Sequence, residues 1–210
     1  MCKPPIILVG SGGHSRACID VIEAEARFRI AGLIGLPSEV GSENLGYPVL
    51  GTDEDLPNLT KKVKSAIVTV GQIESPQSRV RIYQRLRELG CDLPIIVAPD
   101  AHVSHHAELA EGTIIMHGAL VNAGARIGRN CIINSRALIE HDVLVSDHCH
   151  VSTGVTINGG AAVGEGTFIG SGSMVREGIR IGSACVVGMG QRVLSDCEDG
   201  AWLRHGKGML

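Results

Sequence analysis

The second half of the chain repeats one hydrophobic pattern every six residues. Between Val103 and Glu198 the sequence divides into sixteen consecutive hexads, and each begins with Val, Ile or Leu. The fifth position is Ala, Cys, Ser or Thr in eleven of the first fourteen hexads. This period predicts a parallel β-helix in which three hexads form one triangular coil. We expect aliphatic side chains to fill its narrow interior and the fifth positions to lie at tight corners.

The first half follows a different pattern, in which continuous apolar runs alternate with segments of helical period. The runs predict strands at 6–9, 30–34, 47–51, 66–71 and 93–97, the last of which closes the sheet. The helical segments follow residue 14 and cover residues 76–89. Alternation of this kind predicts a small Rossmann-like α/β domain with a parallel sheet. The predicted domains are therefore 1–97 (α/β) and 98–198 (β-helix), with a tail at 199–210.

Composition narrows the classes of function. A net charge of −3 and only five aromatic residues argue against binding to nucleic acid. No apolar run approaches the ~20 residues of a membrane span, and the N-terminal run is too short for a signal peptide. Seven cysteines without a framework spacing fit a reducing compartment. We expect a soluble cytoplasmic protein.

A glycine-rich loop follows the first predicted strand and precedes the first predicted helix. Such a loop can offer backbone N–H groups to a phosphate at a helix N-terminus. Ser15 replaces the third glycine of a dinucleotide motif, and residues 35–37 carry no acid, so the pattern disfavours NAD. A nucleotide-phosphate site and a purely structural turn both remain open. The candidate substrate-binding residues are Gly10, Ser11, Gly12, Gly13 and His14.

His141 is the strongest catalytic candidate, because Glu140 and Asp142 flank it. An imidazole held by a carboxylate is a common general base near neutral pH. Gly159 follows three hexads later and so lies in the same column. With Gly160 it leaves backbone exposed beside the ring, where an N–H group could stabilise an oxyanion. The alternative is a surface histidine with acidic neighbours.

A metal site is disfavoured. His148-Cys149-His150 has the spacing of metal ligands, but Cys149 occupies a fifth position and should point inward. The carbonic anhydrases built on a similar solenoid use a His-x4-His pair, which this sequence lacks. We therefore predict no metal.

Together these motifs resemble the sugar O-/N-acyltransferases of the NeuD/PglD type. The resemblance covers about residues 4–198. It rests on Gly10–His14, Val49–Gly51 with the acids that follow, the Pro99 junction, Ile139–Asp142 and His150–Ser152. It implies a nucleotide-sugar-binding α/β domain joined to a left-handed β-helix, and a homotrimer with active sites between adjacent prisms.

The resemblance also implies roles for individual residues. His141 would be the base, oriented by Asp142 or, as the less favoured choice, by Glu140. Acetyl-CoA would be the co-substrate, held in the later coils, with His150 and the Gly159 N–H at the acetyl carbonyl. Gly12 to His14 would help to hold the sugar nucleotide. The full set of predicted coenzyme-binding residues is His150, Gly159, Gly160, Gly170 and Gly188.

Two segments depart from the family pattern. Many members carry Asp at the end of the second strand, where it meets the nucleotide, but this chain has Gly35-Leu36. Many also end in Gly-x-Pro-Ala-Lys, which helps to cover the coenzyme, whereas this chain has Arg204-His205-Gly206-Lys207. The sequence therefore leaves open which nucleotide is bound and whether the tail contacts the coenzyme.

The resulting hypothesis is an acetyl-CoA-dependent N-acetyltransferase acting on a nucleotide-linked amino sugar in surface-glycan biosynthesis. An alternative is O-acetylation of a sialic-acid-like sugar, although His14 favours the amino-sugar branch. A further alternative is a non-catalytic β-helix that serves as an assembly module.

Overall fold

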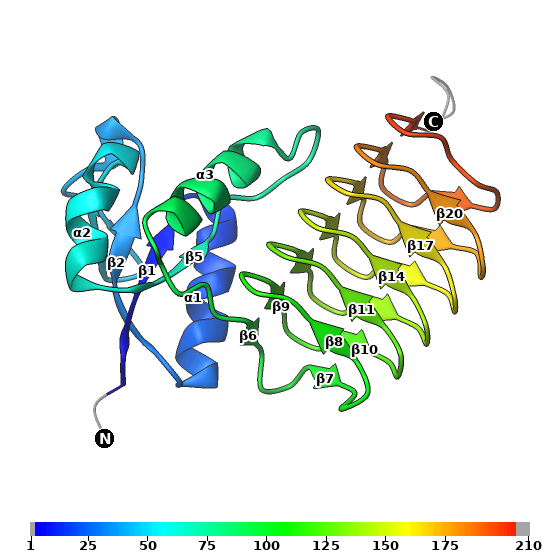
Figure 1. The fold of residues 1–210 in the computed structure, drawn as a ribbon, viewed down its shortest axis with the longest axis horizontal. Helices are drawn as coiled ribbons and strands as arrows, with labels where there is room; N and C mark the ends of the chain where they lie inside the picture. The colour runs from blue at the N-terminus through cyan, green and yellow to red at the C-terminus, as the bar shows by residue number, and fades with distance from the viewer. Residues whose placement is uncertain (1–2, 205–210) are drawn as a thin grey trace. The chain divides into compact units, whose positions relative to one another are not determined.

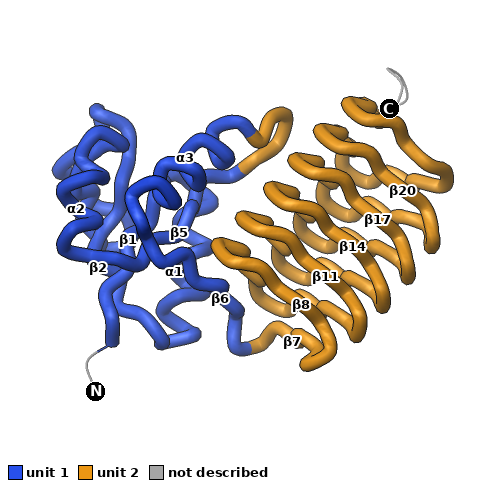
Figure 2. The backbone as a smooth tube through the Cα atoms, in the orientation of Figure 1, with its two compact units in different colours: residues 1–71, 77–99 blue, residues 72–76, 100–210 orange. Residues whose placement is uncertain are grey.

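A computed structural model of the protein describes residues 3–204. The chain forms two compact units, which Figure 2 shows in different colours. The first unit contains the residues up to Gly71 and residues 77–99, and the second contains residues 72–76 and those from Asp100 onward. The predicted boundary between residues 97 and 98 lies two residues earlier, and the sequence assigns residues 72–76 to the first domain.

The first unit is built on a five-stranded sheet with the order β3-β4-β2-β1-β5 (Figure 1). β3 and β4 are antiparallel, and the other neighbours are parallel. The strands are β1 (Pro5–Val9), β2 (Arg29–Ile34), β3 (Glu43–Asn44), β4 (Tyr47–Gly51) and β5 (Ser65–Val68).

The prediction that residues 93–97 close this sheet is wrong. The sheet ends at β5, and the short strand β6 (Ile96–Val97) lies outside it. Only Asp92 makes an isolated bridge to Ser65. Pro94 has no N–H to donate, so this run cannot continue the ladder beside β5.

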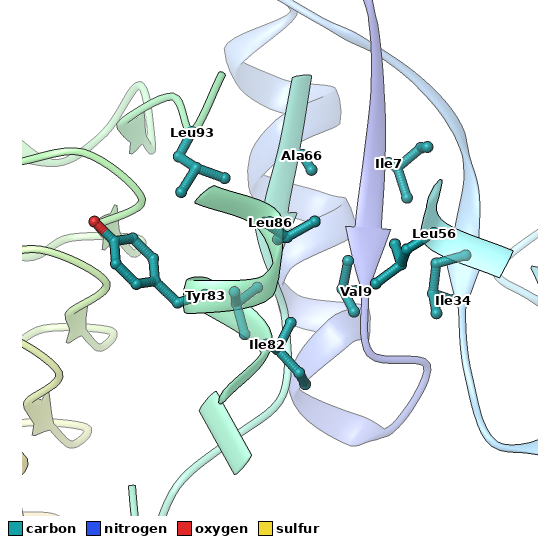
Figure 3. Packing of buried hydrophobic residues seen from close by; sticks show 10 residues of the cluster. Ile7, Val9, Ile34, Leu56, Ala66, Ile82, Tyr83, Leu86 and Leu93 are labelled. Carbon is teal, nitrogen blue, oxygen red and sulfur yellow. The ribbon is translucent and has the colours of Figure 1, made fainter. Parts of the chain in front are cut away.

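Helices cover both faces of the sheet. They are α1 (Gly13–Glu25), α2 (Leu56–Lys62) and α3 (Gln77–Glu88), and two 3-10 turns, η1 (Pro37–Glu39) and η2 (Asp53–Asp55), follow β2 and β4. Ile7 and Val9 of β1 pack in one cluster with Leu56, Ile82 and Leu86 of α2 and α3 (Figure 3). The alternate residues of β1, which point to the opposite face, are also fully buried.

The second unit is a parallel β-helix. Sixteen two-residue strands, β7 to β22, follow one another at a spacing of six residues. Each pairs in parallel with the strand three hexads away, as Leu120 does with Leu138. One sheet contains β7 (His102–Val103), β10 (Leu120–Val121), β13 (Leu138–Ile139), β16 (Thr156–Ile157), β19 (Met174–Val175) and β22 (Arg192–Val193).

The other two walls have the same construction. The second contains β8 (Glu108–Leu109), β11 (Arg126–Ile127), β14 (Leu144–Val145), β17 (Ala162–Val163) and β20 (Arg180–Ile181). The third contains β9 (Ile114–Ile115), β12 (Ile132–Ile133), β15 (His150–Val151), β18 (Phe168–Ile169), β21 (Val186–Val187) and β23 (Trp202–Leu203). β23 follows β22 at ten residues, so the six-residue spacing ends there.

The tight turn of each hexad lies at the fourth position, one residue before the predicted place. This position has positive φ in every hexad from Gly112 to Gly190. Glycine adopts that conformation without a steric penalty, and it occupies most of these positions. The fifth position comes next and faces the interior, where Cys131 and Ala161 are fully buried. Its side chains are small because the interior beside the turn is narrow.

Within residues 3–204, no helix is both long and apolar enough to span a lipid bilayer.

Candidate active site

The His141 side chain lies at the corner that follows β13, and Asp142 holds it. The Nδ1 atom of His141 is 2.9 Å from Oδ2 of Asp142, and the two side chains are 67% and 72% exposed. The hydrogen bond to Asp142 is the main cause that raises the pKa of His141, and the charges of Asp142 and Glu140 add to it. Because a carboxylate accepts at Nδ1, the basic lone pair of the neutral ring is on Nε2.

Asp142 is positioned by the turn of its own hexad. It occupies the fourth position with a φ of 60°, a conformation that Asp tolerates better than most residues. Gly124 lies in the same column one coil earlier, and a Cβ atom there would collide with the Asp142 carboxylate. Gly124 is thus a further site residue, which the hexad period could have revealed because Gly124 lies three hexads before Asp142.

Glu140 takes a different position from Asp142. Its Oε2 accepts a hydrogen bond of 2.9 Å from Nδ2 of Asn122 and one of 3.3 Å from the backbone N–H of His141. Asn122 again comes from the coil before. Glu140 therefore contacts the backbone of His141, whereas Asp142 contacts its ring.

Gly159 lies directly against the ring of His141. A Cβ atom on Gly159 would lie 2.5 Å from Nε2 and 2.6 Å from Cε1, so only glycine leaves room for the imidazole. Gly160 donates its N–H to the carbonyl oxygen of His141 at 2.9 Å. The structure thus brings together Glu140, His141, Asp142, Gly159 and Gly160, as predicted from the period of three hexads.

His150 lies elsewhere on the β-helix. It comes half a coil after His141, and its side chain is buried. Nδ1 donates to the carbonyl oxygen of Gln72 at 2.7 Å, because a carbonyl can only accept. Nε2 is 3.2 Å from Nδ2 of Asn134, which donates to it. In this chain both ring nitrogens of His150 therefore bond to protein groups.

Gly170 and Gly188 form a column of their own. A Cβ atom on Gly170 would lie 2.6 Å from the carbonyl carbon of Gly188, so close packing of successive coils requires glycine there. They follow the wall that contains His150, not the wall that leads to His141. The predicted coenzyme-binding residues thus fall into two groups on different sides of the prism.

Among residues 3–204, no three His, Cys, Asp or Glu side chains are grouped so that they could hold a metal ion. Cys149 is fully buried, and Nδ1 of His148 lies 3.0 Å from Nδ2 of Asn130. At the C-terminal end, Arg204 stacks on Trp202 at 4.0 Å and pairs with Glu74 at 3.6 Å. Residues 205–207, whose contact with the coenzyme the sequence leaves open, lie outside the described residues.

The first unit contains a pocket of about 770 Å³ at the carboxyl ends of β1, β2 and β5. In parallel α/β sheets, ligands commonly bind at this edge. All five predicted loop residues, Gly10 to His14, line the pocket. They are joined by residues from later segments, which include Gly35, Glu39, Asp53, Glu54, Thr69, Ser78 and Arg81.

The glycines of the loop have different functions. Gly10 has a φ of 128°, and a Cβ atom there would lie 2.8 Å from the carbonyl carbon of Thr69, so this glycine is structural. Gly12 is the N-cap of α1 with an ordinary φ of −79°, and nothing lies within 4 Å of a Cβ built on Gly12 or Gly13. The first turn of α1 has neither an acidic residue nor a side-chain cap. Its N–H groups therefore favour an anion in the pocket.

The ring of His14 contacts Cys18, which lies one turn later on α1. Its Nε2 is 3.4 Å from Sγ of Cys18. Burial raises the pKa of Cys18 to about 12, so this residue remains a neutral thiol. His14 is thereby placed beside the pocket that it lines.

Glu39 supplies the carboxylate that residues 35–37 lack after β2. Its Oε2 accepts hydrogen bonds from the Ser11 hydroxyl at 2.6 Å and from the Leu36 N–H at 2.8 Å. These bonds lower the pKa of Glu39. Gly35 makes room for this contact, because a Cβ atom there would lie 2.5 Å from the Ser11 hydroxyl. The turn η1 returns Glu39 to Ser11 of the glycine-rich loop. The sequence does not reveal this acid because it comes after residues 35–37, where the family pattern expects one.

Two families match the chain, one in each half. The PglD N-terminal domain matches residues 5–86. The hexapeptide repeat of succinyl-transferase matches residues 124–158 and 160–194. A search of curated protein sequences gives no match.

Solved structures resemble nearly the whole chain. A histidine-to-asparagine mutant of perosamine N-acetyltransferase from Caulobacter crescentus, in complex with CoA and GDP-perosamine, has a TM-score of 0.89. It is 30% identical over 94% of this chain and 92% of its own. The acetyltransferase domain of PglB from Neisseria gonorrhoeae FA1090, in complex with acetyl coenzyme A, has a TM-score of 0.87 and 28% identity, with 95% of each chain covered. WeeI from Acinetobacter baumannii AYE, at 17% identity and a TM-score of 0.61, shares the fold.

The two halves together therefore define a hexapeptide-repeat acyltransferase. The protein belongs to the sugar acyltransferases of the PglD type, as its motifs predicted. The predicted fold class, a small parallel α/β domain followed by a left-handed parallel β-helix, is confirmed.

Proposed function

We propose that the protein is an acetyl-CoA-dependent N-acetyltransferase that acts on a nucleotide-linked amino sugar. The single observation that carries this function is the corner formed by His141, Asp142 and Gly159. Asp142 binds Nδ1 of the His141 imidazole, and Nε2 faces the backbone of Gly159, which has no side chain. The solved relatives with the same architecture are an N-acetyltransferase bound to CoA and GDP-perosamine and an acetyltransferase domain bound to acetyl coenzyme A.

The reaction is a direct transfer. The amine nitrogen of the sugar attacks the thioester carbonyl carbon, so that a C–N bond forms and the C–S bond breaks. Nε2 of His141 takes the proton that the amine loses, and that proton can then pass to the departing thiolate. Asp142 keeps the Nδ1 proton in place and stabilises the imidazolium. Its contact with Nδ1 favours Asp142 over Glu140 as the orienting acid.

The oxyanion of the tetrahedral intermediate needs donors beside His141. The N–H of Gly159 is the nearest backbone candidate, because the glycine lies against the ring. Nδ1 of His150 donates to the carbonyl oxygen of Gln72, and its Nε2 lies against Nδ2 of Asn134. A role for His150 at the acetyl carbonyl therefore requires Nε2 to carry a proton and to exchange its contact with Asn134 for the carbonyl oxygen.

The pocket of the first unit holds the sugar nucleotide in this proposal. The N-terminus of α1 faces it without a competing acid, and Gly12 and Gly13 leave space for a phosphate to approach the backbone. Glu39 and Ser11 are placed at the same edge to contact the nucleoside.

The enzyme acts as a homotrimer built along the β-helix. His141 and His150 are half a coil apart and lie on different sides of one prism, so a second chain is needed to bring both groups to one acetyl group. The wall that leads to His141 also carries an outward column of side chains whose middle members are mainly apolar and at least partly exposed, which suits contact between prisms. These middle members are Leu120, Leu138, Thr156 and Met174, and His102 and Arg192 stand at the two ends of the column.

Acetyl transfer from acetyl-CoA to a panel of UDP-, GDP- and CMP-linked amino sugars, together with their hydroxyl analogues, tests the function. Product with an amino sugar supports it. Product with the hydroxyl analogues alone would instead indicate O-acetylation. If no sugar of the panel gave a product, a non-catalytic assembly module would be the remaining function. Light scattering tests the trimer, because an active species near the 22.1 kDa of one chain would refute a shared site.

A further inference from the structure

The nucleotide pocket is lined by more negative than positive side chains. Three carboxylates line it, from Glu39, Asp53 and Glu54. Apart from His14, the cation among its described lining residues is Arg81 on α3. Three carboxylates outweigh one guanidinium, so a dianionic diphosphate depends on Arg81 for a side-chain charge opposite to its own.

Arg81 is free to move toward such a ligand. Its NH2 atom lies 3.8 Å from Oδ2 of Asp53, and the two side chains are 75% and 49% exposed. An exposed, single-contact ion pair of this length contributes little to stability. A guanidinium forms much stronger paired hydrogen bonds with phosphate oxygens. The pair with Asp53 is therefore easily exchanged for a phosphate.

The other side of the pocket supplies the complementary donors. The N-terminus of α1 presents backbone N–H groups beside Gly12 and Gly13, where nothing fills the space within 4 Å of a Cβ. One helix end and one arginine can together share the two charges of a diphosphate, whereas a single phosphate needs only the helix end.

We propose that Arg81 binds the diphosphate of the sugar nucleotide and that Asp53 holds Arg81 at the pocket while the pocket is empty. This inference rests on the proposed function and narrows it, because it assigns nucleoside diphosphate sugars rather than CMP-linked sugars as substrates. It makes Arg81 a residue that determines specificity for the diphosphate.

Calorimetric titration with GDP, UDP, GMP, UMP and CMP tests the inference. For whichever base the wild-type protein prefers, Arg81→Gln should weaken the diphosphate by about 10-fold or more and the monophosphate by no more than about 2-fold. Arg81→Lys should recover part of the loss. Arg85→Gln is the matched control, since Arg85 lies on the same helix, pairs with Glu88 and does not line the pocket.

Asp53→Asn gives an independent check. It releases Arg81 and removes one negative charge, so diphosphate affinity should stay equal or rise. Equal GDP and UDP affinity in Arg81→Gln and wild type would overturn the inference. A loss in Asp53→Asn as large as that in Arg81→Gln would also overturn it, because Asp53 would then contact the ligand itself. If the wild-type protein bound CMP and no diphosphate, the inference would fail while the proposed function stood. If it bound none of the five nucleotides, the proposed function would fail irrespective of Arg81.

Discussion

The catalytic corner and the nucleotide pocket are constructed in opposite ways. At the corner, the contacts between coils join residues three hexads apart, as Asn122 does with Glu140 and His141 with Gly159. In the pocket, Ser11 contacts Glu39 from another segment, and Arg81 arrives on a third. In the repeat, site residues that contact each other are a fixed number of positions apart in the sequence. In the α/β pocket, their contacts depend on how separate helices, strands and turns pack together.

This difference predicts that the two regions can be separated by mutation. A change at the corner should alter the chemical step and leave binding of the sugar nucleotide intact. A change in the pocket should do the reverse.

The largest effect is expected from His141→Ala. The ring is exposed, so its loss opens no cavity and the fold should survive. Removal of a general base should lower kcat by roughly 10²-fold or more. Steady-state kinetics should show this loss. The Kd of the sugar nucleotide should stay within about 2-fold of wild type, because the substitution does not remove a contact that binds the substrate in its ground state. A near-native kcat would refute the assignment of His141, and failure to fold would make its role structural.

A loss of about 10²-fold in kcat is also expected from Gly159→Ala, because the new methyl group displaces the imidazole by a fraction of an ångström or more. Its backbone is not in the left-handed region, so the substitution adds no strain of its own. Thr153→Ala is the control, since Thr153 occupies the same third hexad position at another corner. Native kcat in Gly159→Ala, with the melting temperature unchanged in both variants, would contradict the tight contact with His141.

These corner residues show how far the sequence could lead. The period alone placed Gly159 beside His141, and the same period could have revealed Gly124 under Asp142. It could not reveal that Glu39 returns to Ser11, because that contact depends on the path of η1 and on the absence of a side chain at Gly35. Nor could it show that Gln72 reaches His150, because Gln72 lies 78 positions earlier and outside the repeat.

Gly12→Val tests the pocket with a smaller effect. The φ of Gly12 is ordinary and its surroundings are open, so a side chain there adds no backbone strain. The valine should block the approach of phosphate and raise KM for the sugar nucleotide about 10-fold, the size of one lost charged hydrogen bond. The Kd of acetyl-CoA should not change.

Gly10→Ala provides the contrast within the same loop. Its Cβ would press on Thr69, and its φ is unfavourable for alanine, so the melting temperature should fall and both ligands should weaken together. If Gly12→Val behaved in the same way, the loop would be a structural turn rather than a phosphate site.

The smallest effect is expected from Glu140→Gln, and it concerns pH. Both Asp142 and Glu140 raise the pKa of His141, so the neutral base forms only above that raised value and the rate falls as the pH drops through it. Glutamine keeps the contact with Asn122 but removes one charge, so the acidic limb of kcat/KM should move slightly to lower pH with kcat within about 3-fold of wild type.

Asp142→Asn should move the same limb further, because the hydrogen bond to Asp142 is the main cause of the raised pKa. It should also lower kcat at every pH, since the orientation of the ring depends on that bond. The pH profiles of the two variants decide which acid orients His141. A larger shift and a larger loss in Glu140→Gln would reverse the roles assigned here to the two carboxylates.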